Sequence, residues 1–278
     1  MSSTQDSQEP GIRAILDAFA NATPTMVPER ALSEAHDCRE AITPHLQRAV
    51  IQMHDLSALG RLQAEGDWRL HSFALHLLAA WRVPGTYDLI LKSLTLDDRY
   101  DSRWLMGEAT SDWPHLLLTT FDGDVERLFG IVWRDDPPWN SDLILCCLGV
   151  LTGAHHHRPG DRAAIEAGFE KTLATCEDEL IRDSLMTRIA KLKIHSLMPQ
   201  VWRVIDSPPN QPHPYRLDIE KALQEPWTVD FSDPGSEPNP IVRPREDLLA
   251  IICGWWYFQE PDEFVPESPL ERKMWERE

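Results

Sequence analysis

The chain has 278 residues, of which 42% are apolar and 26% charged, a balance typical of folded globular proteins. Lysine and arginine number 27 against 45 aspartate and glutamate residues, which gives a net charge of −18. A field of this sign repels nucleic acids and anionic membranes, so we expect neither as a partner, and it favours a basic protein.

The N-terminal sequence and the cysteines indicate where the protein works. The first ten residues, MSSTQDSQEP, are polar and lack the apolar core of a secretion signal. The longest apolar runs are shorter than the ~20 residues that cross a bilayer. Five cysteines without a Cys-x-x-Cys spacing favour reduced thiols over a disulfide framework. Together these features predict a cytoplasmic protein.

Helical periodicity runs through almost the whole chain. Apolar residues recur at helical spacing in 11–22, 28–35, 43–54, 68–81, 86–94, 112–121, 124–132, 141–151, 161–173, 177–194, 199–205 and 216–224. Polar residues that favour helix N-caps stand at the start of most of these segments. We predict as caps Thr43, Asp67, Thr86, Ser111 or Asp112, Asp124, Ser141 and Asp161.

Short helices with their own caps, joined by short turns, are what a helical-repeat protein requires. No strand pattern interrupts them, so the sequence predicts an all-α fold: an irregular HEAT-like α-solenoid of antiparallel helix pairs. A compact all-α bundle is the alternative. We assign residues 11–227 to the helical-repeat domain, 228–243 to an acidic Pro-rich linker, and 244–278 to a C-terminal amphipathic capping helix and acidic tail.

The stretch FDGDVERL, residues 121–128, contains a pair of carboxylates. Asp122 and Asp124 could present two oxygen ligands to a hard cation. A calcium loop starting at Asp122 would need a glutamate at its twelfth position, where the chain has Trp133. We favour the simpler interpretation, in which Gly123 ends one helix and Asp124 caps the next.

Other acidic residues have the spacing of a catalytic pair. Glu108 and Asp112 would share one face of a helix, as the carboxylates of a general acid and base can. Such pairs are common in an acidic chain, so we expect these residues to form part of a partner-binding surface with Asp122 and Asp124. No nucleophile elbow and no phosphate-binding glycine loop is present, and we predict no cofactor.

Three consecutive histidines, His155–His157, lie in AHHHRPGD. Adjacent histidines on a helix point about 100° apart and converge poorly on one metal. A loop would let two of them bind a metal together with Asp161. We favour a solvated loop between helices and predict no metal site.

The densest aromatic run is GWWYF, residues 254–258. We favour packing of this run against the final helix pair, as a cap on the solenoid. The alternative is an exposed anchor in which Trp255, Trp256 and Tyr257 dock on a partner. These three are therefore candidate partner-binding residues.

Three segments carry a resemblance to a known family: REAITPHLQRAV (39–50), WLMGEATSDWPHLLLTTFDGDVERLFGIV (104–132) and DSLMTRIAKLKIHSLMPQVWRVID (183–206). With them, residues from about 29 to 227 resemble a bacterial family catalogued as domain of unknown function 1186. The third segment departs from the pattern, since Lys191 stands where an aspartate is expected. The resemblance implies a HEAT-like helical-repeat domain without assigned catalytic residues. Some members add a SEC-C-type zinc motif, which we expect to be absent because Cys253 is the only cysteine in that part.

These features predict a non-enzymatic protein-binding scaffold. Its acidic surface would hold a basic protein, in the manner of an immunity or antitoxin-type inhibitor that masks a basic toxin. One alternative is a metal-dependent helical hydrolase that uses Asp122, Asp124, Glu108 and His155–His157. The other is a regulatory or assembly adaptor that docks through the C-terminal aromatic helix.

Overall fold

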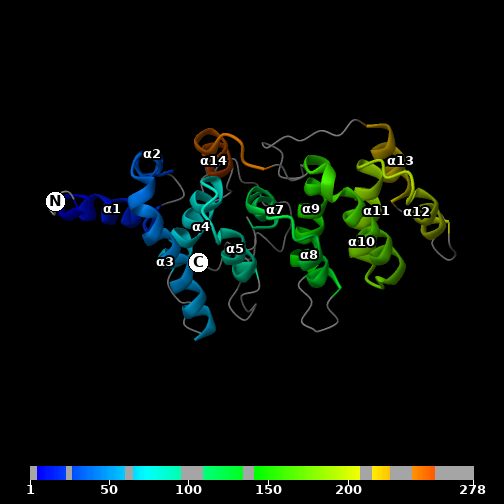
Figure 1. Cartoon of the computed structure of the whole chain (residues 1–278), viewed down its shortest axis with the longest axis horizontal. Helices are drawn as coiled ribbons and strands as arrows, with labels where there is room; N and C mark the ends of the chain where they lie inside the picture. The colour runs from blue at the N-terminus through cyan, green and yellow to red at the C-terminus, as the bar shows by residue number, and fades with distance from the viewer. Residues whose placement is uncertain are drawn as a thin grey trace, which may run out of the picture.

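The structure, a computed structural model, describes residues 5–22, 27–59, 65–94, 109–133, 141–206, 215–225 and 240–253 (Figure 1). Within these residues it contains helices and no strand. In chain order the elements are α1 (Gln5–Ala20), α2 (Glu29–Asp37), α3 (Arg39–Ala58), α4 (Glu65–Ala80), α5 (Thr86–Leu94), α7 (Ala109–Thr120), α8 (Val125–Val132), α9 (Ser141–His157), the 3-10 turn η1 (Pro159–Asp161), α10 (Arg162–Thr175), α11 (Glu179–Lys191), α12 (Met198–Ile205), α13 (Arg216–Gln224) and α14 (Pro244–Cys253).

The helices form two rows along an elongated molecule (Figure 1). In one row α1, α4, α7, α9, α11 and α13 each contact the next. In the other row α3 contacts α5 and α8 contacts α10, while α12 packs on α11. Helices α4 and α9, for example, bury one face against their own row and another against the opposite row. The all-α helical-repeat fold predicted from the sequence is confirmed.

A continuous apolar core runs between the two rows. At the N-terminal end Phe19 of α1 stacks on Phe73 of α4 with ring centroids 4.8 Å apart. Farther along, Phe129 of α8 meets Phe169 of α10 edge to face at 6.0 Å. All four rings are almost completely buried. This core holds neighbouring helix pairs together, since each pair has little interior of its own.

Several predicted helix starts are wrong. Helix α4 begins at Glu65 and α7 at Ala109, so Asp67, Ser111 and Asp112 lie inside these helices and not at the predicted cap positions. Thr86 is the first residue of α5, and its buried hydroxyl makes no capping hydrogen bond within the described residues.

Thr43 and Asp161 are also not caps. Helix α3 begins at Arg39, and Thr43 lies inside it, where its hydroxyl donates to the carbonyl of Arg39 at 2.7 Å. Pro44 is therefore also inside the helix, as its sixth residue, and because it has no N–H it cannot donate to the carbonyl of Glu40. Asp161 precedes α10 but makes no side-chain cap; its carboxylate pairs with the Nε of Arg158 at 2.7 Å.

The cysteines within the described residues are unpaired thiols. Cys38 and Cys176 are half-buried, and Cys146 and Cys147 are buried in α9. Burial raises the pKa of Cys147 to about 12, so its thiol stays protonated at neutral pH. The adjacent pair in α9 therefore acts as two small apolar side chains of the core, as expected from the sequence.

The C-terminal helix lies in an unexpected place. Helix α14 packs on α2 and α4, near the N-terminal half of the solenoid, and not on the final pair α12 and α13 (Figure 1). The GWWYF run and the tail lie outside the described residues, as does most of the predicted linker. None of the described helices combines the length and the apolar character needed to cross a membrane.

Candidate functional site

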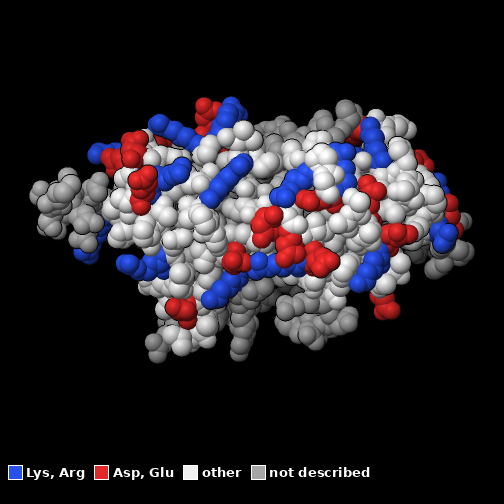
Figure 2. Space-filling model, in the orientation of Figure 1, with Lys and Arg blue, Asp and Glu red and all other residues white. Residues whose placement is uncertain are grey.

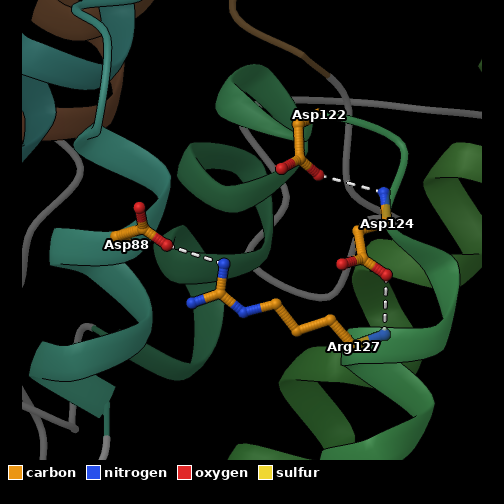
Figure 3. Close-up of polar contacts among 4 residues, drawn as sticks. All are labelled: Asp88, Asp122, Asp124 and Arg127. Atoms are coloured by element: carbon orange, nitrogen blue, oxygen red, sulfur yellow. Dashed lines mark hydrogen bonds and ion pairs between the residues drawn. The ribbon is translucent and has the colours of Figure 1, made fainter.

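The FDGD stretch forms the turn that joins α7 to α8 (Figure 3). The carboxylate of Asp122 accepts a hydrogen bond from the backbone amide of Asp124 at 3.0 Å. The carboxylate of Asp124 accepts one from the backbone amide of Arg127 at 3.0 Å, which caps α8. Both carboxylates thus stabilise the turn, as the sequence predicted for Asp124.

Two arginines hold this turn against its neighbours. The Nη1 of Arg127 donates to the carboxylate of Asp88 in α5 at 2.6 Å (Figure 3). The guanidinium of Arg127 also lies over the ring of Tyr87. Arg158, at the end of α9, donates to the carbonyl of Phe121 at 2.9 Å and covers the ring of that residue. The turn is therefore linked to α5 on one side and to α9 on the other.

Gly123 is required at the centre of the turn. Its φ is +104°, in the region that residues with a Cβ rarely adopt. A Cβ at this position would also lie 2.7 Å from the Nη2 of Arg158. The close approach of the arginine and the positive φ both explain why the turn carries glycine here.

Four exposed carboxylates surround this turn, and we call them the acidic turn surface: Asp88, Asp122, Asp124 and Glu126. Two basic side chains lie beside them: Arg127, which pairs with Asp88, and Arg158, which donates to the carbonyl of Phe121. On the face shown in Figure 2, basic and acidic side chains are interspersed, and acidic ones gather near the middle, where Figure 1 places α5, α7 and α8. Acidic side chains therefore gather locally on this face, which elsewhere mixes both signs.

The structure does not bring the predicted site residues together. Asp112 lies in the first turn of α7, at the opposite end of that helix from Asp122, and its carboxylate is 3.5 Å from the Nε2 of His76. Glu108, Trp255, Trp256 and Tyr257 lie outside the described residues. Within the described part of the chain, only Asp122 and Asp124 of the predicted set share one surface.

The three histidines occupy the last turn of α9, so the predicted loop is wrong. His155 is buried, with its Nε2 2.9 Å from the carboxylate of Glu166. His156 and His157 are exposed, and their rings meet edge to face at 4.8 Å. The helical hydrogen bonds continue through them, and the amide of Arg158 donates to the carbonyl of Ala154 at 2.7 Å. Among the residues that the structure describes, no three metal-ligating side chains gather at one point.

A buried polar cluster at the junction of α3, α4 and α5 was not predicted. The hydroxyl of Ser93 lies 2.7 Å from the Nε2 of His54 and 3.0 Å from that of His71, and it donates to the carbonyl of Leu89. Because that bond uses its only proton, Ser93 accepts from both imidazoles. Burial lowers the pKa of His54 to about 4 and that of His71 to about 3. The two histidines therefore remain neutral at physiological pH.

This cluster has the residue types of a nucleophilic site but not its access. Each of the three side chains is at most 7% exposed. A serine that donates to a backbone carbonyl is also not activated by the histidines, which donate to it. The cluster is structural, and its sequence separation of 22 and 39 residues leaves no local signal by which it could have been found.

The cap of α8 provides a direct stability test. We expect Asp124→Ala to lower the free energy of unfolding by about 1 kcal/mol, because it leaves the Arg127 amide without its acceptor. Asp124→Asn keeps an acceptor oxygen and should remain close to wild type. Urea unfolding measures both. Equal stability of the alanine and asparagine variants would contradict the capping role.

Comparison with known proteins adds a family but no activity. A family model described as "Protein of unknown function (DUF1186)" matches residues 11–208, more than half of the chain. The match confirms the resemblance drawn from the sequence segments. No curated protein and no solved structure matches the chain.

Proposed function

This chain belongs to the DUF1186 family, and we propose that it is a non-enzymatic protein-binding scaffold that captures a basic protein through the acidic turn surface. The proposal rests on one observation above others. Asp88, Asp122, Asp124 and Glu126 are exposed, carry negative charge, and are held in place by a turn linked to α5 and α9. A surface whose net charge is negative and whose carboxylates are held in fixed positions favours capture of a positively charged partner.

The structural roles of the carboxylates argue against the hydrolase alternative for this turn. Asp122 and Asp124 each use an oxygen to accept a backbone amide, and Asp88 is paired with Arg127. The carboxylates therefore stabilise the joint between α7 and α8. Metal analysis of the purified protein tests the alternative, since stoichiometric metal that survives dialysis would favour a metal-dependent enzyme.

The binding experiment starts from the protein that co-purifies with the tagged chain. We expect this partner to be basic, and its affinity, measured by isothermal titration, to fall at least about tenfold between ~50 mM and ~500 mM salt. Electrostatic capture requires this dependence because salt screens exposed charges. An affinity that does not change with salt would contradict it.

Two matched variants locate the surface. Asp122→Asn, Asp124→Asn and Glu126→Gln together remove three charges and keep the acceptor oxygens of the turn. The control removes three charges around another helix cap, at Glu177, Asp178 and Glu179, where Asp178 accepts the amide of Ile181. We expect only the first triple variant to weaken binding at low salt. Equal weakening by both would point to the overall charge of the molecule.

A concrete form of the proposal is an immunity or antitoxin-type protein of the bacterial cytoplasm. Such a protein would cover the basic substrate-binding surface of a toxin by imitating its anionic substrate. In that form, addition of the chain to the purified partner abolishes the activity of the partner at low salt and restores it at high salt. An active partner in the saturated complex would leave the scaffold proposal standing but remove the inhibitory role.

A further inference from the structure

The segment 240–253 makes a long-range contact within the chain. Helix α13, which precedes it, packs on α11 at one end of the solenoid, whereas α14 packs on α2 and α4 (Figure 1). The backbone amide of Ile241 donates to the hydroxyl of Thr119 in α7 at 2.8 Å, across 122 residues of sequence. The Nη2 of Arg245 donates to the hydroxyl of Ser33 in α2 at 3.1 Å, across 212 residues.

The side of the segment that faces the solenoid consists of a few apolar residues. Ile241, Leu248 and Ile252 are at most 1% exposed, and Leu249 is partly buried against the core. Val242, by contrast, is 70% exposed. Leu248 and Ile252 are four residues apart, so they lie on the same face of α14. The segment therefore contacts the solenoid as an amphipathic helix with an apolar residue just before its start.

The start of α14 is stabilised within the segment itself. The carboxylate of Asp247 accepts the backbone amides of Val242 at 3.0 Å and Arg243 at 2.8 Å. Arg243 also pairs with Glu246 at 2.8 Å. Two backbone amides just before the helix are thus satisfied within the segment, in the manner of a capping box.

The part of α4 that lies beneath α14 has to be shielded from solvent. Every residue of α4 from Phe73 to Ala80 is buried, and all of them except His76 are apolar. Helices α1, α3, α5 and α7 contact α4, and α14 contacts it as well. If α14 were to leave, an apolar face of α4 would be open to solvent, which is typical of a binding surface.

We propose that α2, α4 and Thr119 of α7 form a binding site for an amphipathic helix, and that α14 is its intramolecular ligand. A partner helix with the same pattern takes its place: an apolar residue before the start, a basic residue in the first turn, and two apolar residues four apart. The helix site stands on the contacts of α14 alone. That an external helix uses this site rests on the proposed scaffold function, and the site specifies the class of partner: an amphipathic helix.

Tethering explains why the site is filled by α14. Fourteen residues, 226–239, separate the described end of the α13 region from the segment. A ligand joined through a short linker has an effective concentration on the order of millimolar. A free peptide at micromolar concentration should therefore fail to displace α14 from the wild-type protein, but should bind once α14 is detached.

The test uses a fluorescently labelled peptide of residues 240–253 and the full-length chain. Ile252→Asp places a charge at a completely buried contact and should detach α14. We expect the peptide to bind this variant at least tenfold more tightly than wild type, as measured by fluorescence anisotropy. A peptide that carries Ile252→Asp should bind neither protein. Val242→Asp, at an exposed position, should behave as wild type.

Two further measurements interpret each outcome. Hydrogen exchange at the Ile241 amide reports whether the segment is docked, and a thermal melt reports whether the variant is folded. Fast exchange in a folded Ile252→Asp variant that does not bind the peptide would overturn the proposal. Unchanged exchange would overturn it too, since a docked apolar face cannot accept the new charge. If Ile252→Asp does not fold, Thr119→Val removes the acceptor of the Ile241 amide, and should raise peptide affinity by a smaller factor; no rise would refute the site.

The acidic turn surface plays no part in this assay. The triple variant at Asp122, Asp124 and Glu126 should leave peptide binding unchanged in the Ile252→Asp background. Failure of salt-dependent capture would therefore leave the helix site intact, and failure of peptide binding would leave the acidic surface intact.

Discussion

Acidification from pH 7 to pH 5 is expected to lower the free energy of unfolding by about 4 kcal/mol through His54 and His71 alone. In the unfolded chain both have a pKa near ~6.5. In the folded protein burial lowers the pKa of His54 to about 4 and that of His71 to about 3. Between these values the unfolded chain binds more protons than the folded protein. The stabilisation that comes from the two neutral histidines is therefore fully present above about pH 6.5 and is lost as the pH falls.

The geometry of the cluster explains why protonation is so unfavourable. Both imidazoles already donate through Nε2 to Ser93, and the Nδ1 atoms are buried with no hydrogen-bond partner within the described residues. A proton on either Nδ1 would create a buried charge without an acceptor. The positive charge of Lys92 also lowers the pKa of His54, and the neighbouring His54 and His76 lower that of His71.

Urea unfolding at pH 7, 6 and 5 measures the effect. His54→Gln and His71→Gln keep a donor near the position of Nε2 and do not titrate. Each should reduce the loss of stability between pH 7 and pH 5 by about 2 kcal/mol. His195→Gln, at an exposed position, serves as the control and should keep the wild-type loss. A double variant that still loses as much as wild type would refute the assignment.

Gly168→Ala is expected to destabilise the protein by about 2 kcal/mol, although alanine favours helices. Gly168 lies in α10, and a Cβ there would be 2.1 Å from two ring carbons of Phe129 in α8. The ring has little room to move, since it stacks on Trp133 at 5.0 Å and meets Phe169 at 6.0 Å. Trp133 is itself held by a hydrogen bond from its Nε1 to Thr172 at 2.9 Å.

A second glycine gives the matched control. Gly130 lies in α8, exposed, and a Cβ added there would have no neighbouring atom within 4 Å, so Gly130→Ala should stabilise by up to about 1 kcal/mol. Thermal and urea unfolding should thus move in opposite directions for the two variants. Phe129→Leu in the Gly168→Ala background should cost less than the sum of the single changes, because the smaller side chain relieves the overlap. Strict additivity would contradict direct contact.

The sequence predicted well those features of the fold that depend on residues close together in the chain. The span of α13, 216–224, and the cap of α8 at Asp124 were both predicted, because apolar periodicity and a cap depend on residues three or four apart. The errors lie where local signals compete. Thr43 resembled a cap before Pro44, but α3 starts earlier, at Arg39, and continues through that proline as its sixth residue.

The candidate site was predicted in part, for the same reason. Asp122 and Asp124 are two residues apart and occupy one turn, so they could be placed together from the sequence. The additions of Asp88 and Arg127 depend on the packing of α5 against α7 and α8. Asp112 is close to the turn in sequence, so the sequence grouped the two. In the structure Asp112 lies at the start of the 12-residue helix α7 and the turn lies at its end.

Two further features depend entirely on the tertiary structure: the His54, His71 and Ser93 cluster, and the docking of α14 on α2 and α4. Periodicity indicates that a helix has an apolar face, but not which helix covers it. The predominantly apolar stretch of α4 from Phe73 to Ala80 is buried on every side, by four neighbouring helices and by the remote α14. By itself the sequence determined the helices and their local caps, whose hydrogen bonds close within one turn. Only the tertiary structure decided which remote segments share a surface, because those contacts form when the whole chain packs.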